Sequence, residues 1–293
     1  MPTLLNGNVV CSAVKEDLKK EIETFESKPG LAVILVGDNP ASKAYVGMKK
    51  KTCAEIGVHS VEFKLDVDDN EDALIEVIDE CNRRDDIHGI LLQLPLPDHF
   101  DEDKMLQLID PRKDVDGFHP VNVGKLLIGL DTFKSCTPYG VFKMMDYYDI
   151  DPAGKHVVIL GRSNIVGKPL AAILVQKGRG ANATVTICHS RTQNLEEITK
   201  QADILVAAIG IPEFVKPEMV KEDAIVIDVG INRVDDASLE KGYKLVGDVD
   251  FESVKDKTSS ITPVPGGVGP MTIAMLMTNT VQAYKQSQAV LAI

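Results

Sequence analysis

The alternation of short, strongly apolar runs with amphipathic stretches is the feature that most constrains how this chain can fold. The runs "LAVILVG" (31–37), "VEFKLDV" (61–67) and "GILLQLPL" (89–96) have the length and apolar content of buried strands. Helical patterns at 42–57 and 71–84 separate them. Because parallel strands are joined by helices that cover the faces of the sheet, this order predicts an α/β domain with a parallel sheet.

A second series of the same kind follows. Its strands are expected at 155–161, 183–189, 203–210, 224–230 and 244–249, and its helices at about 167–178, 194–201 and 216–221. After it, residues 269–288 predict a long helix that no strand follows. We expect this helix to pack back on the first domain.

The chain is therefore expected to form two α/β domains, and its 293 residues suffice for two domains of ordinary size. The segment between the two series, 113–140, is rich in Gly, Pro and Asp, which is typical of a break between domains. The first domain is predicted to comprise 1–139 and 270–293, and the second 140–269.

Charge and cysteine content narrow the classes of function. The net charge of −12 excludes a general affinity for nucleic acid. No apolar run reaches the roughly 18 residues of a membrane-spanning helix, and no signal peptide is recognised, so we expect no membrane association. The five cysteines are scattered and never form a C-x-x-C pair, which favours a reducing, cytoplasmic compartment. This spacing also argues against structural zinc, and no metal site is expected.

The segment "ILGRSNIVGKP" (159–169) has the context of a dinucleotide-binding loop, because it follows an apolar strand and opens a helix. Gly161 allows a tight turn, Ser163 stands where the usual fingerprint has its second glycine, and Gly167 comes one position later than the third. The N–H groups at the helix start can face a pyrophosphate. An ordinary strand–turn–helix connection is the alternative.

The end of the second strand in this series indicates which cofactor the loop would bind. NAD-specific domains usually carry an acidic residue there, which binds the ribose 2′-OH. Here Ser190 and Arg191 occupy that place, and no Asp or Glu occurs between His156 and Leu195. Together with Arg162 they could bind a 2′-phosphate, so we expect NADP rather than NAD. Solvated surface cations are the alternative.

Three polar features interrupt the apolar pattern of the first domain. Tyr45 and Lys49 share one helical face, where a lysine near a cleft could move protons; an ordinary basic helix is the alternative. Gln93 lies toward the C-terminal end of an apolar strand, where parallel sheets bind ligands. A structural hydrogen bond of its buried amide to a loop is the alternative. Asp116 follows Asp114 in a loop before Gly117, where the spacing by itself favours a tight turn stabilised by Asp side chains over a functional site.

The loop "TPVPGGVGPMT" (262–272) concentrates glycine and proline directly before the final helix. Such a composition suits a rigid loop shaped around a ligand, and it also suits a hinge between domains.

Together these segments resemble the bifunctional methylenetetrahydrofolate dehydrogenase/cyclohydrolase family, known in bacteria as the FolD proteins. The resemblance covers nearly the whole chain and rests on seven motifs in the family's order: "YVGMKKKTCAEIGV", "LLQLPLP", "KDVDGFHPVNVG", "CTPYG", "GRSNIVGKP", "CHSRT" and "TPVPGGVGPMT". Seven ordered motifs are far more specific than any one of them.

The resemblance implies a folate-binding catalytic domain, a Rossmann-like domain that binds NADP, and an active site in the cleft between them. It implies oxidation of 5,10-methylenetetrahydrofolate to the 5,10-methenyl form with NADP as hydride acceptor, followed by hydrolysis to 10-formyltetrahydrofolate. The small-molecule partner would thus be a folate. A homodimer formed through the cofactor domain is a further expectation.

Residue roles also follow from the resemblance. Lys49 would transfer protons and activate water in the hydrolysis, Gln93 would hydrogen-bond to that lysine, and Tyr45 would stack on the aminobenzoate and help orient Lys49. Asp116 would bind the amino and ring N–H groups of the pterin. The remaining expected contacts are Leu94, Pro95, Pro265, Gly266 and Gly267 for the folate, and Gly161, Arg162, Ser163, Gly167, Ser190, Arg191 and Ile231 for the cofactor.

Two other functions account for less of the chain. A shikimate-dehydrogenase-like NADP oxidoreductase could share the cofactor half, but it places its motifs differently from Tyr45, Lys49, Gln93 and Asp116. A protein that binds NADP without turnover is the alternative from another class, and the presence of Lys49 argues against it.

Overall fold

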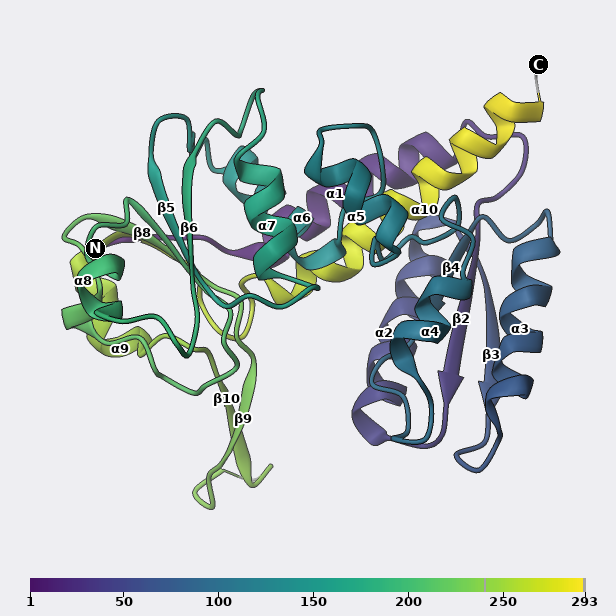
Figure 1. Ribbon diagram of the computed structural model, residues 1–293, viewed down its shortest axis with the longest axis horizontal. Helices are drawn as coiled ribbons and strands as arrows, with labels where there is room; N and C mark the ends of the chain where they lie inside the picture. Colours follow the sequence, from purple (N-terminus) through teal and green to yellow (C-terminus); the bar gives the residue numbers. More distant parts are fainter. Residues whose placement is uncertain (240, 292–293) are drawn as a thin grey trace. The chain divides into compact units, whose positions relative to one another are not determined.

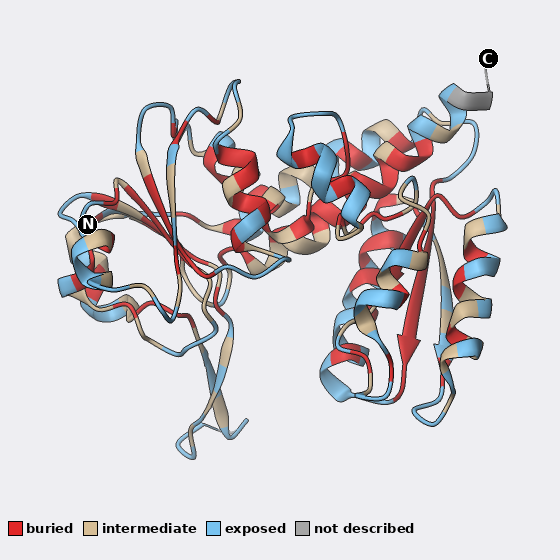
Figure 2. Ribbon diagram, in the orientation of Figure 1, coloured by how far each residue is buried: buried red, intermediate tan, exposed pale blue. Residues whose placement is uncertain are grey.

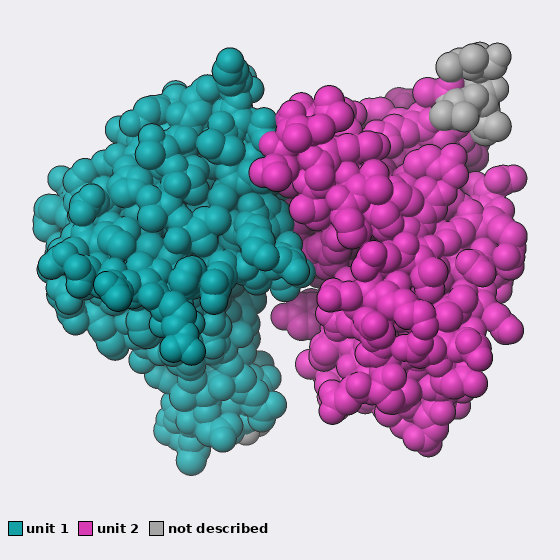
Figure 3. Space-filling view, viewed as in Figure 1, with its two compact units in different colours: residues 1–12, 137–272 teal, residues 13–136, 273–293 magenta. Residues whose placement is uncertain are grey.

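The computed structural model describes residues 1–239 and 241–291 (Figure 1). The chain forms two compact units, which Figure 3 shows in different colours. Unit 1 consists of Met1–Ser12 and Thr137–Thr272, and unit 2 of Ala13–Cys136 and Ile273–Ile293. Both contain parallel sheets with helical connections, which confirms the predicted two-domain α/β class.

Unit 2 is built on a three-stranded parallel sheet in the order β3 (His59–Leu65), β2 (Gly30–Val36), β4 (Gly89–Leu92). The helices α2 (Pro40–Ile56) and α3 (Glu71–Arg83) connect these strands in sequence. All seven residues of β2 are buried (Figure 2), as expected for the middle strand of a parallel sheet.

The strand β4 is shorter than the predicted run 89–96, because it ends at Leu92. Gln93 is therefore the first residue after the strand, although its N–H still donates to the carbonyl of Ile34 at 2.9 Å. The side chain of Gln93 thus leaves the carboxyl end of the sheet, the edge at which parallel sheets place ligands.

Four further helices contribute to unit 2. They are α1 (Gly7–Ile22), which belongs to unit 2 from Ala13 onward, α4 (Glu102–Leu108), α5 (Pro120–Leu127) and α10 (Gly269–Leu291). From Ile273 onward α10 belongs to unit 2, and its Met277 sulfur lies 3.6 Å from the thiol of Cys53 in α2. This contact confirms that the final helix packs back on the first domain.

Unit 1 is built on a six-stranded sheet in which all five neighbouring pairs are parallel. Its order is β1 (Thr3–Leu4), β11 (Thr258–Ile261), β8 (Ala224–Asp228), β7 (Ile204–Ala207), β5 (His156–Leu160), β6 (Thr184–Cys188). Its helical segments are α6 (Cys136–Tyr147), α7 (Gly167–Leu174), α8 (Leu195–Thr199), η1 (Pro217–Met219), α9 (Phe251–Val254) and η2 (Lys255–Lys257).

The expected fifth strand at 244–249 is wrong as a member of this sheet. It corresponds to β10 (Tyr243–Val246), which pairs antiparallel with β9 (Asn232–Asp235) in a separate hairpin (Figure 1). Every residue of these two strands is exposed or half-buried, whereas an inner strand of a parallel sheet is covered on both faces. The place beside β8 is taken by β11 instead.

The predicted limits of the first domain differ from unit 2 at the N-terminus. Met1–Ser12 belong to unit 1, because β1 pairs with β11 and the N–H of Gly7 donates to Gly266 at 2.9 Å. A two-residue edge strand carries no periodic signal, so the sequence pattern could not place it. None of the described helices is both long and apolar enough to cross a membrane.

Candidate functional site

The helix α2 carries Lys49 into the interior of unit 2. Asn39 caps the start of this helix by accepting hydrogen bonds from the N–H groups of Ala41 (2.9 Å) and Ser42 (3.2 Å). Gly57 ends it with a left-handed backbone at φ 94°. Within these fixed ends, Lys49 is only 8 % exposed.

Tyr45 lies one turn before Lys49 but at the surface, where it is 44 % exposed. Met48 beside it is 45 % exposed. Tyr45 and Met48 are three positions apart on the helix, a spacing that places an exposed aromatic ring and an exposed thioether on the same side of α2. The sequence analysis assigned no role to Met48.

The side-chain amide of Gln93 holds the end of Lys49. Its Oε1 accepts a hydrogen bond from the Lys49 Nζ at 2.9 Å, and its Nε2 donates to the carbonyl of Leu94 at 2.7 Å. The second bond fixes which end of the amide faces the lysine, so that only an acceptor is offered to Nζ. The structure therefore brings together two of the predicted site residues that are 44 positions apart in sequence. Leu94 is half-buried and Pro95 exposed beside them.

Asp116 completes this cluster, together with a residue to which the sequence analysis gave no role. The carboxyl of Asp116 interacts electrostatically with Lys49 and with the thiol of Cys136. Cys136 is 2 % exposed, and its Sγ also donates to the carbonyl of Val115 at 3.4 Å. Burial raises the pKa of this thiol well above its usual value, which favours the protonated thiol over the nucleophilic thiolate.

Burial moves both charged groups of the cluster toward neutrality. It lowers the pKa of Lys49, against the nearby negative charge of Asp116. It raises the pKa of Asp116 to about 6, where Lys49 acts in the opposite direction and Asp114 adds to the increase. A lysine whose pKa is lowered in this way has a larger neutral fraction, and a neutral amine can accept a proton.

In unit 1, Gly161 and Gly167 shape the predicted dinucleotide loop between β5 and α7. Gly161 has φ 123°, and a Cβ there would lie 2.1 Å from the carbonyl oxygen of Ala208. A Cβ on Gly167 would lie 2.1 Å from the carbonyl oxygen of Gly161. Only glycine allows these close approaches, so the start of α7 is held directly against the carboxyl end of the sheet.

Ser163 organises the turn that leads into α7, because its Oγ accepts a hydrogen bond from the N–H of Val166 at 3.1 Å. The side chains of Arg162, Ser190 and Arg191 are exposed. β5 and β6 are paired neighbours, and Arg162 and Ser190 each follow the last residue of their strand by two positions. Donors and positive charge thus collect where an adenosine 2′-phosphate would lie. The residues present fit NADP.

Two buried aspartates cross-link the loops at this edge of the sheet. Asp228 accepts hydrogen bonds from the N–H groups of Gly230 (2.9 Å), Asp248 (3.0 Å) and Val249 (2.8 Å). Burial raises its pKa to about 7, although the backbone donors act in the opposite direction. The sequence analysis missed Asp228 and Asp248.

Asp248 extends this network to two further segments. Its Oδ2 accepts from the N–H groups of Ile209 (2.7 Å) and Gly210 (2.9 Å), just after β7. Its Oδ1 accepts from the Asn232 side chain at 2.9 Å, at the start of β9. Ile231, which precedes Asn232, is therefore held in place while its own side chain is 45 % exposed.

The loop that contains Pro265, Gly266 and Gly267 also belongs to unit 1. Gly266 has φ 101°, and a Cβ on Gly7 would lie 1.8 Å from the carbonyl oxygen of Gly267, so the loop packs on the start of α1. The predicted folate contacts are thus divided: these three lie in unit 1, and the others in unit 2.

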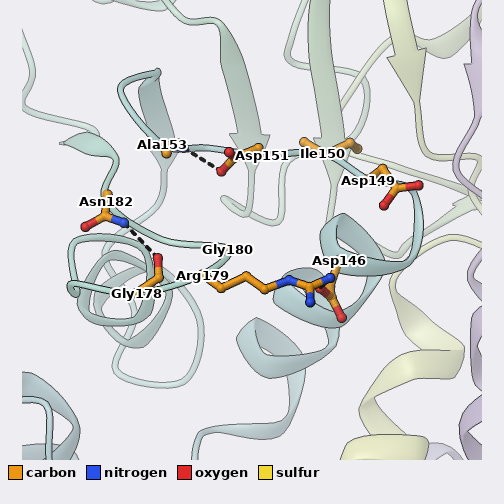
Figure 4. A pocket seen from close by; sticks show the side chains of 9 residues that line it. All are labelled: Asp146, Asp149, Ile150, Asp151, Ala153, Gly178, Arg179, Gly180 and Asn182. Atoms are coloured by element: carbon orange, nitrogen blue, oxygen red, sulfur yellow. Dashed lines mark hydrogen bonds and ion pairs between the residues drawn. The ribbon is translucent and has the colours of Figure 1, made fainter.

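An open cavity of about 390 Å³ in unit 1 contains none of the predicted residues (Figure 4). It is lined by Asp146, Asp149, Ile150, Asp151, Ala153, Gly178, Arg179, Gly180 and Asn182. These residues include the segments that lead into β5 and β6, at the amino ends of the strands, whereas the ligands of parallel sheets lie at the carboxyl ends. The 3.5 Å ion pair of Arg179 with Asp146 is exposed and contributes little to stability.

Among the described residues, no group of three or more His, Cys, Asp or Glu could hold a metal ion.

Two family models match successive parts of the chain. The family model described as tetrahydrofolate dehydrogenase/cyclohydrolase, catalytic domain, matches residues 5–116. The model described as tetrahydrofolate dehydrogenase/cyclohydrolase, NAD(P)-binding domain, matches residues 135–288. The chain belongs to the tetrahydrofolate dehydrogenase/cyclohydrolase family. The resemblance found in the sequence is thereby confirmed.

Relatives within this family match the chain over nearly its full length. The bifunctional protein FolD of Oceanobacillus iheyensis is 56 % identical over 288 residues, which cover 97 % of this chain and 98 % of the relative. The bifunctional protein FolD of Chlorobium phaeobacteroides is 53 % identical over 288 residues, with 96 % and 97 % covered.

Solved structures of the tetrahydrofolate dehydrogenase/cyclohydrolase family share the fold. The bifunctional enzyme FolD of Campylobacter jejuni has 50 % identity and a TM-score of 0.92, covering 98 % of this chain and 99 % of its own. The Trypanosoma brucei enzyme, solved with NADP cofactor and inhibitor, has 37 % identity and a TM-score of 0.91, covering 98 % of each chain. Shikimate dehydrogenase from Aquifex aeolicus, at 13 % identity and a TM-score of 0.52, shares the fold alone.

The raised pKa of Asp116 predicts that Asp116→Asn stabilises the protein near neutral pH. The folded-state pKa of about 6 exceeds the unfolded value of about 3.9, so the folded state binds more protons in between and stability is lost as pH rises through this range. Asparagine carries no charge. The free energy of unfolding of the variant should therefore exceed that of the wild type by about 1–2 kcal/mol at pH 7.5 and differ little from it at pH 4. Urea unfolding at the two pH values measures this.

Asp110→Asn is the opposite-sign control. The bond from Arg112 lowers the pKa of Asp110, so this variant should lose stability at pH 7.5. A variant at Asp116 that is no more stable than the wild type at pH 7.5 would contradict the prediction.

Proposed function

We propose that this chain oxidises 5,10-methylenetetrahydrofolate to 5,10-methenyltetrahydrofolate with NADP and then hydrolyses the product to 10-formyltetrahydrofolate. The observation that carries the proposal is the buried Lys49, hydrogen-bonded to Gln93 and facing Asp116, in a chain 56 % identical to a bifunctional FolD protein. One-carbon folate metabolism, including the supply of formyl groups for purine synthesis, is the setting that this chemistry fits.

The folate would bind on unit 2 through groups of three kinds. The exposed ring of Tyr45 would stack on the aminobenzoate, and Asp116 would accept hydrogen bonds from the amino and ring N–H groups of the pterin. Leu94 and Pro95 would line the site beside Gln93. Pro265, Gly266 and Gly267 are the further folate contacts of the proposal.

Oxidation requires placement rather than acid–base chemistry. NADP, when bound, supplies a nicotinamide ring that accepts the hydride. The loop at Gly161 and Gly167 would hold its pyrophosphate at the start of α7, and Ser163 would keep that turn in shape. Ile231 would contact the cofactor from the segment that Asp248 fixes. The chain's contribution to the hydride step is thus orientation.

The hydrolysis requires a proton acceptor, because water loses a proton as it attacks the cationic methenyl carbon. Lys49 would take that proton. Gln93 accepts one N–H of the lysine, which leaves the lone pair of a neutral amine directed elsewhere. A cationic substrate nearby would lower the pKa of Lys49 further, in the same direction as burial.

Arg162, Ser190 and Arg191 would distinguish NADP from NAD. They would bind the 2′-phosphate, and no acidic residue occurs between His156 and Leu195 to bind a free 2′-OH. The proposal also places the protein in the cytoplasm, which its five free cysteines support.

We propose in addition that the protein is a homodimer formed through unit 1. The strand β6 lies at one end of the six-stranded sheet, where its outer side has no neighbouring strand in the described chain. Ile187 on this strand is 36 % exposed and Val175 nearby in sequence is 55 % exposed. An exposed strand edge with apolar side chains suits pairing with the same edge of a second copy.

Lys49→Met should abolish the hydrolysis of methenyltetrahydrofolate. Loss of a general acid–base group typically lowers the rate by about 10²–10⁴-fold. The measurement is the decay of methenyl absorbance, with NADPH formation from methylenetetrahydrofolate followed in parallel.

Lys50→Met is the matched control, because Lys50 is exposed and pairs with Glu62. If Lys49→Met hydrolyses at the wild-type rate, another group accepts the proton. If the wild type forms no NADPH, the chain binds its ligands without turnover.

Removing both arginines, as Arg162→Ala with Arg191→Ala, should raise the KM for NADP by about tenfold or more and leave the KM for NAD nearly unchanged. Each charge-assisted hydrogen bond contributes about 1.5–3 kcal/mol, and only NADP carries the phosphate. Steady-state kinetics with both nucleotides test this. Arg179→Ala is the control, since Arg179 is exposed beside the cavity at the opposite edge of the sheet. Equal KM increases for both nucleotides would exclude recognition of the 2′-phosphate.

Ile187→Lys should convert a dimer into a monomer, because a lysine at an exposed strand edge opposes edge-to-edge pairing. Light scattering of the purified protein gives the mass directly. Val67→Lys, at an exposed apolar position in unit 2, should leave the mass unchanged. A wild type that is monomeric at micromolar concentration overturns the dimer proposal.

A further inference from the structure

Asp116 lies in a loop that regular secondary structure does not hold. The loop follows an isolated bridge between Ile90 and Asp114, and turns at Gly117 with φ 74°. The position of the Asp116 carboxyl relative to Lys49 therefore depends on what fixes the residues on either side of it.

After Asp116, the loop is fixed by one buried carboxylate. The Oδ1 of Asp114 accepts hydrogen bonds from the N–H groups of Gly117 (3.1 Å) and Phe118 (3.2 Å). Its Oδ2 accepts from the N–H of His119 and the side chain of Asn122, both at 2.8 Å. Asp114 is 2 % exposed, so four donors and no competing water define the course of the chain here.

Before Asp116, the loop is fixed from the helix α10. The Nδ2 of Asn279 donates to the carbonyl of Val115 at 2.7 Å and to the carbonyl of Lys134 at 2.9 Å. Asn279 is fully buried. It ties the residue directly before Asp116 to the segment that precedes α6.

Gly117 shows how closely these two segments approach. A Cβ on Gly117 would lie 2.7 Å from the carbonyl carbon of Lys134 and from the nitrogen of Ser135. The loop thus rests directly against the backbone that Asn279 also binds, and it cannot shift without breaking the Asn279 bonds.

We infer that Asp114 and Asn279 are positioning residues that set the place of the Asp116 carboxyl beside Lys49. Their hydrogen bonds end on the backbone around Asp116, on Asn122 and, for Asn279, also on the Sγ of Cys136 at 3.8 Å. The Cys136 thiol itself interacts with Asp116, so both residues act on the reaction through Asp116. A displacement of about 1 Å in a binding group can lower turnover by about 10²-fold, which is why two buried side chains are committed to one loop. This inference rests on the proposed role of Asp116 in folate binding.

Besides fixing the loop, Asp114 acts electrostatically on the Asp116 carboxyl. Its negative charge raises the pKa of Asp116, while Lys49 and the thiol of Cys136 lower it. Replacing Asp114 by Asn removes this charge, and it also removes the hydrogen bonds that one carboxylate oxygen accepts from the loop. The acidic limb of the pH profile, which would report Asp116, should then move to lower pH.

The test is a double-mutant cycle between Asn279→Leu and Asp116→Asn. Asn279→Leu keeps the size of the side chain and removes both donors. Alone, it should lower kcat/KM for methylenetetrahydrofolate about tenfold or more, through KM, with the KM for NADP unchanged. In the Asp116→Asn background it should have less than a twofold further effect, because its influence passes through Asp116.

Asp114→Asn is the second variant, for the case that Asn279→Leu does not fold. It should show the same coupling to Asp116→Asn, and its acidic limb should move to lower pH. Thr280→Val is the matched control: Thr280 is also fully buried on α10, but its hydroxyl donates within the helix, to Leu276 at 2.8 Å. It should cost stability without raising the folate KM.

Three results would overturn the inference. Independent, multiplicative effects in the cycle would show that Asn279 does not act through Asp116. An equal rise in folate KM for Thr280→Val would show a general loss of structure. If Asp116→Asn itself leaves the folate KM unchanged, the proposed role of Asp116 fails, and the inference fails with it.

Discussion

Buried carboxylates that accept backbone N–H groups are the interaction on which both sites depend. A parallel sheet leaves its functional loops at the carboxyl ends of the strands, where no partner strand satisfies their backbone donors. In unit 2 Asp114 takes four donors, and in unit 1 Asp228 and Asp248 take three each. Each carboxylate gives an irregular segment one defined shape. The backbone of these loops therefore has a defined conformation, although the loops belong to no helix or strand.

Burial also disfavours the charged forms of Lys49 and Asp116, the groups proposed to act on the folate. Lys49 is buried, and its Nζ donates to one neutral acceptor, the side-chain oxygen of Gln93. Asp116 is held near Asp114, a second carboxylate, which raises its pKa further. These arrangements are unfavourable for folding and favourable for moving a proton, and such opposition is typical of functional sites.

Much of the architecture could be predicted from the sequence, and the failures have physical causes. The apolar run of β2 is visible because all seven of its residues are buried. The two-residue strand β1 is too short to show an alternating apolar pattern. The strand β10 has strand-forming residues but is too little buried to be an inner strand.

Within the candidate site, the pairing of Lys49 with Gln93 could not follow from spacing, since 44 residues separate them. It came instead from the family resemblance. The tight-turn interpretation of the loop near Asp116 correctly described the bonds of Asp114. Asn279 gave no signal, because one amide in an apolar helix has no pattern around it.

The pairing of β1 with β11 has a consequence for how the protein is made. The two strands are joined through Thr3↔Ser260, so the first residues of the chain find their partners only after some 260 residues have been synthesised. Unit 2 is also discontinuous and takes its last helix from Ile273 onward. On a ribosome, the sheet of unit 1 is therefore incomplete until β11 has been made, and the core of unit 2 until α10 has been made. Until β11 pairs with β8, the exposed edge of β8 has to be kept from other chains.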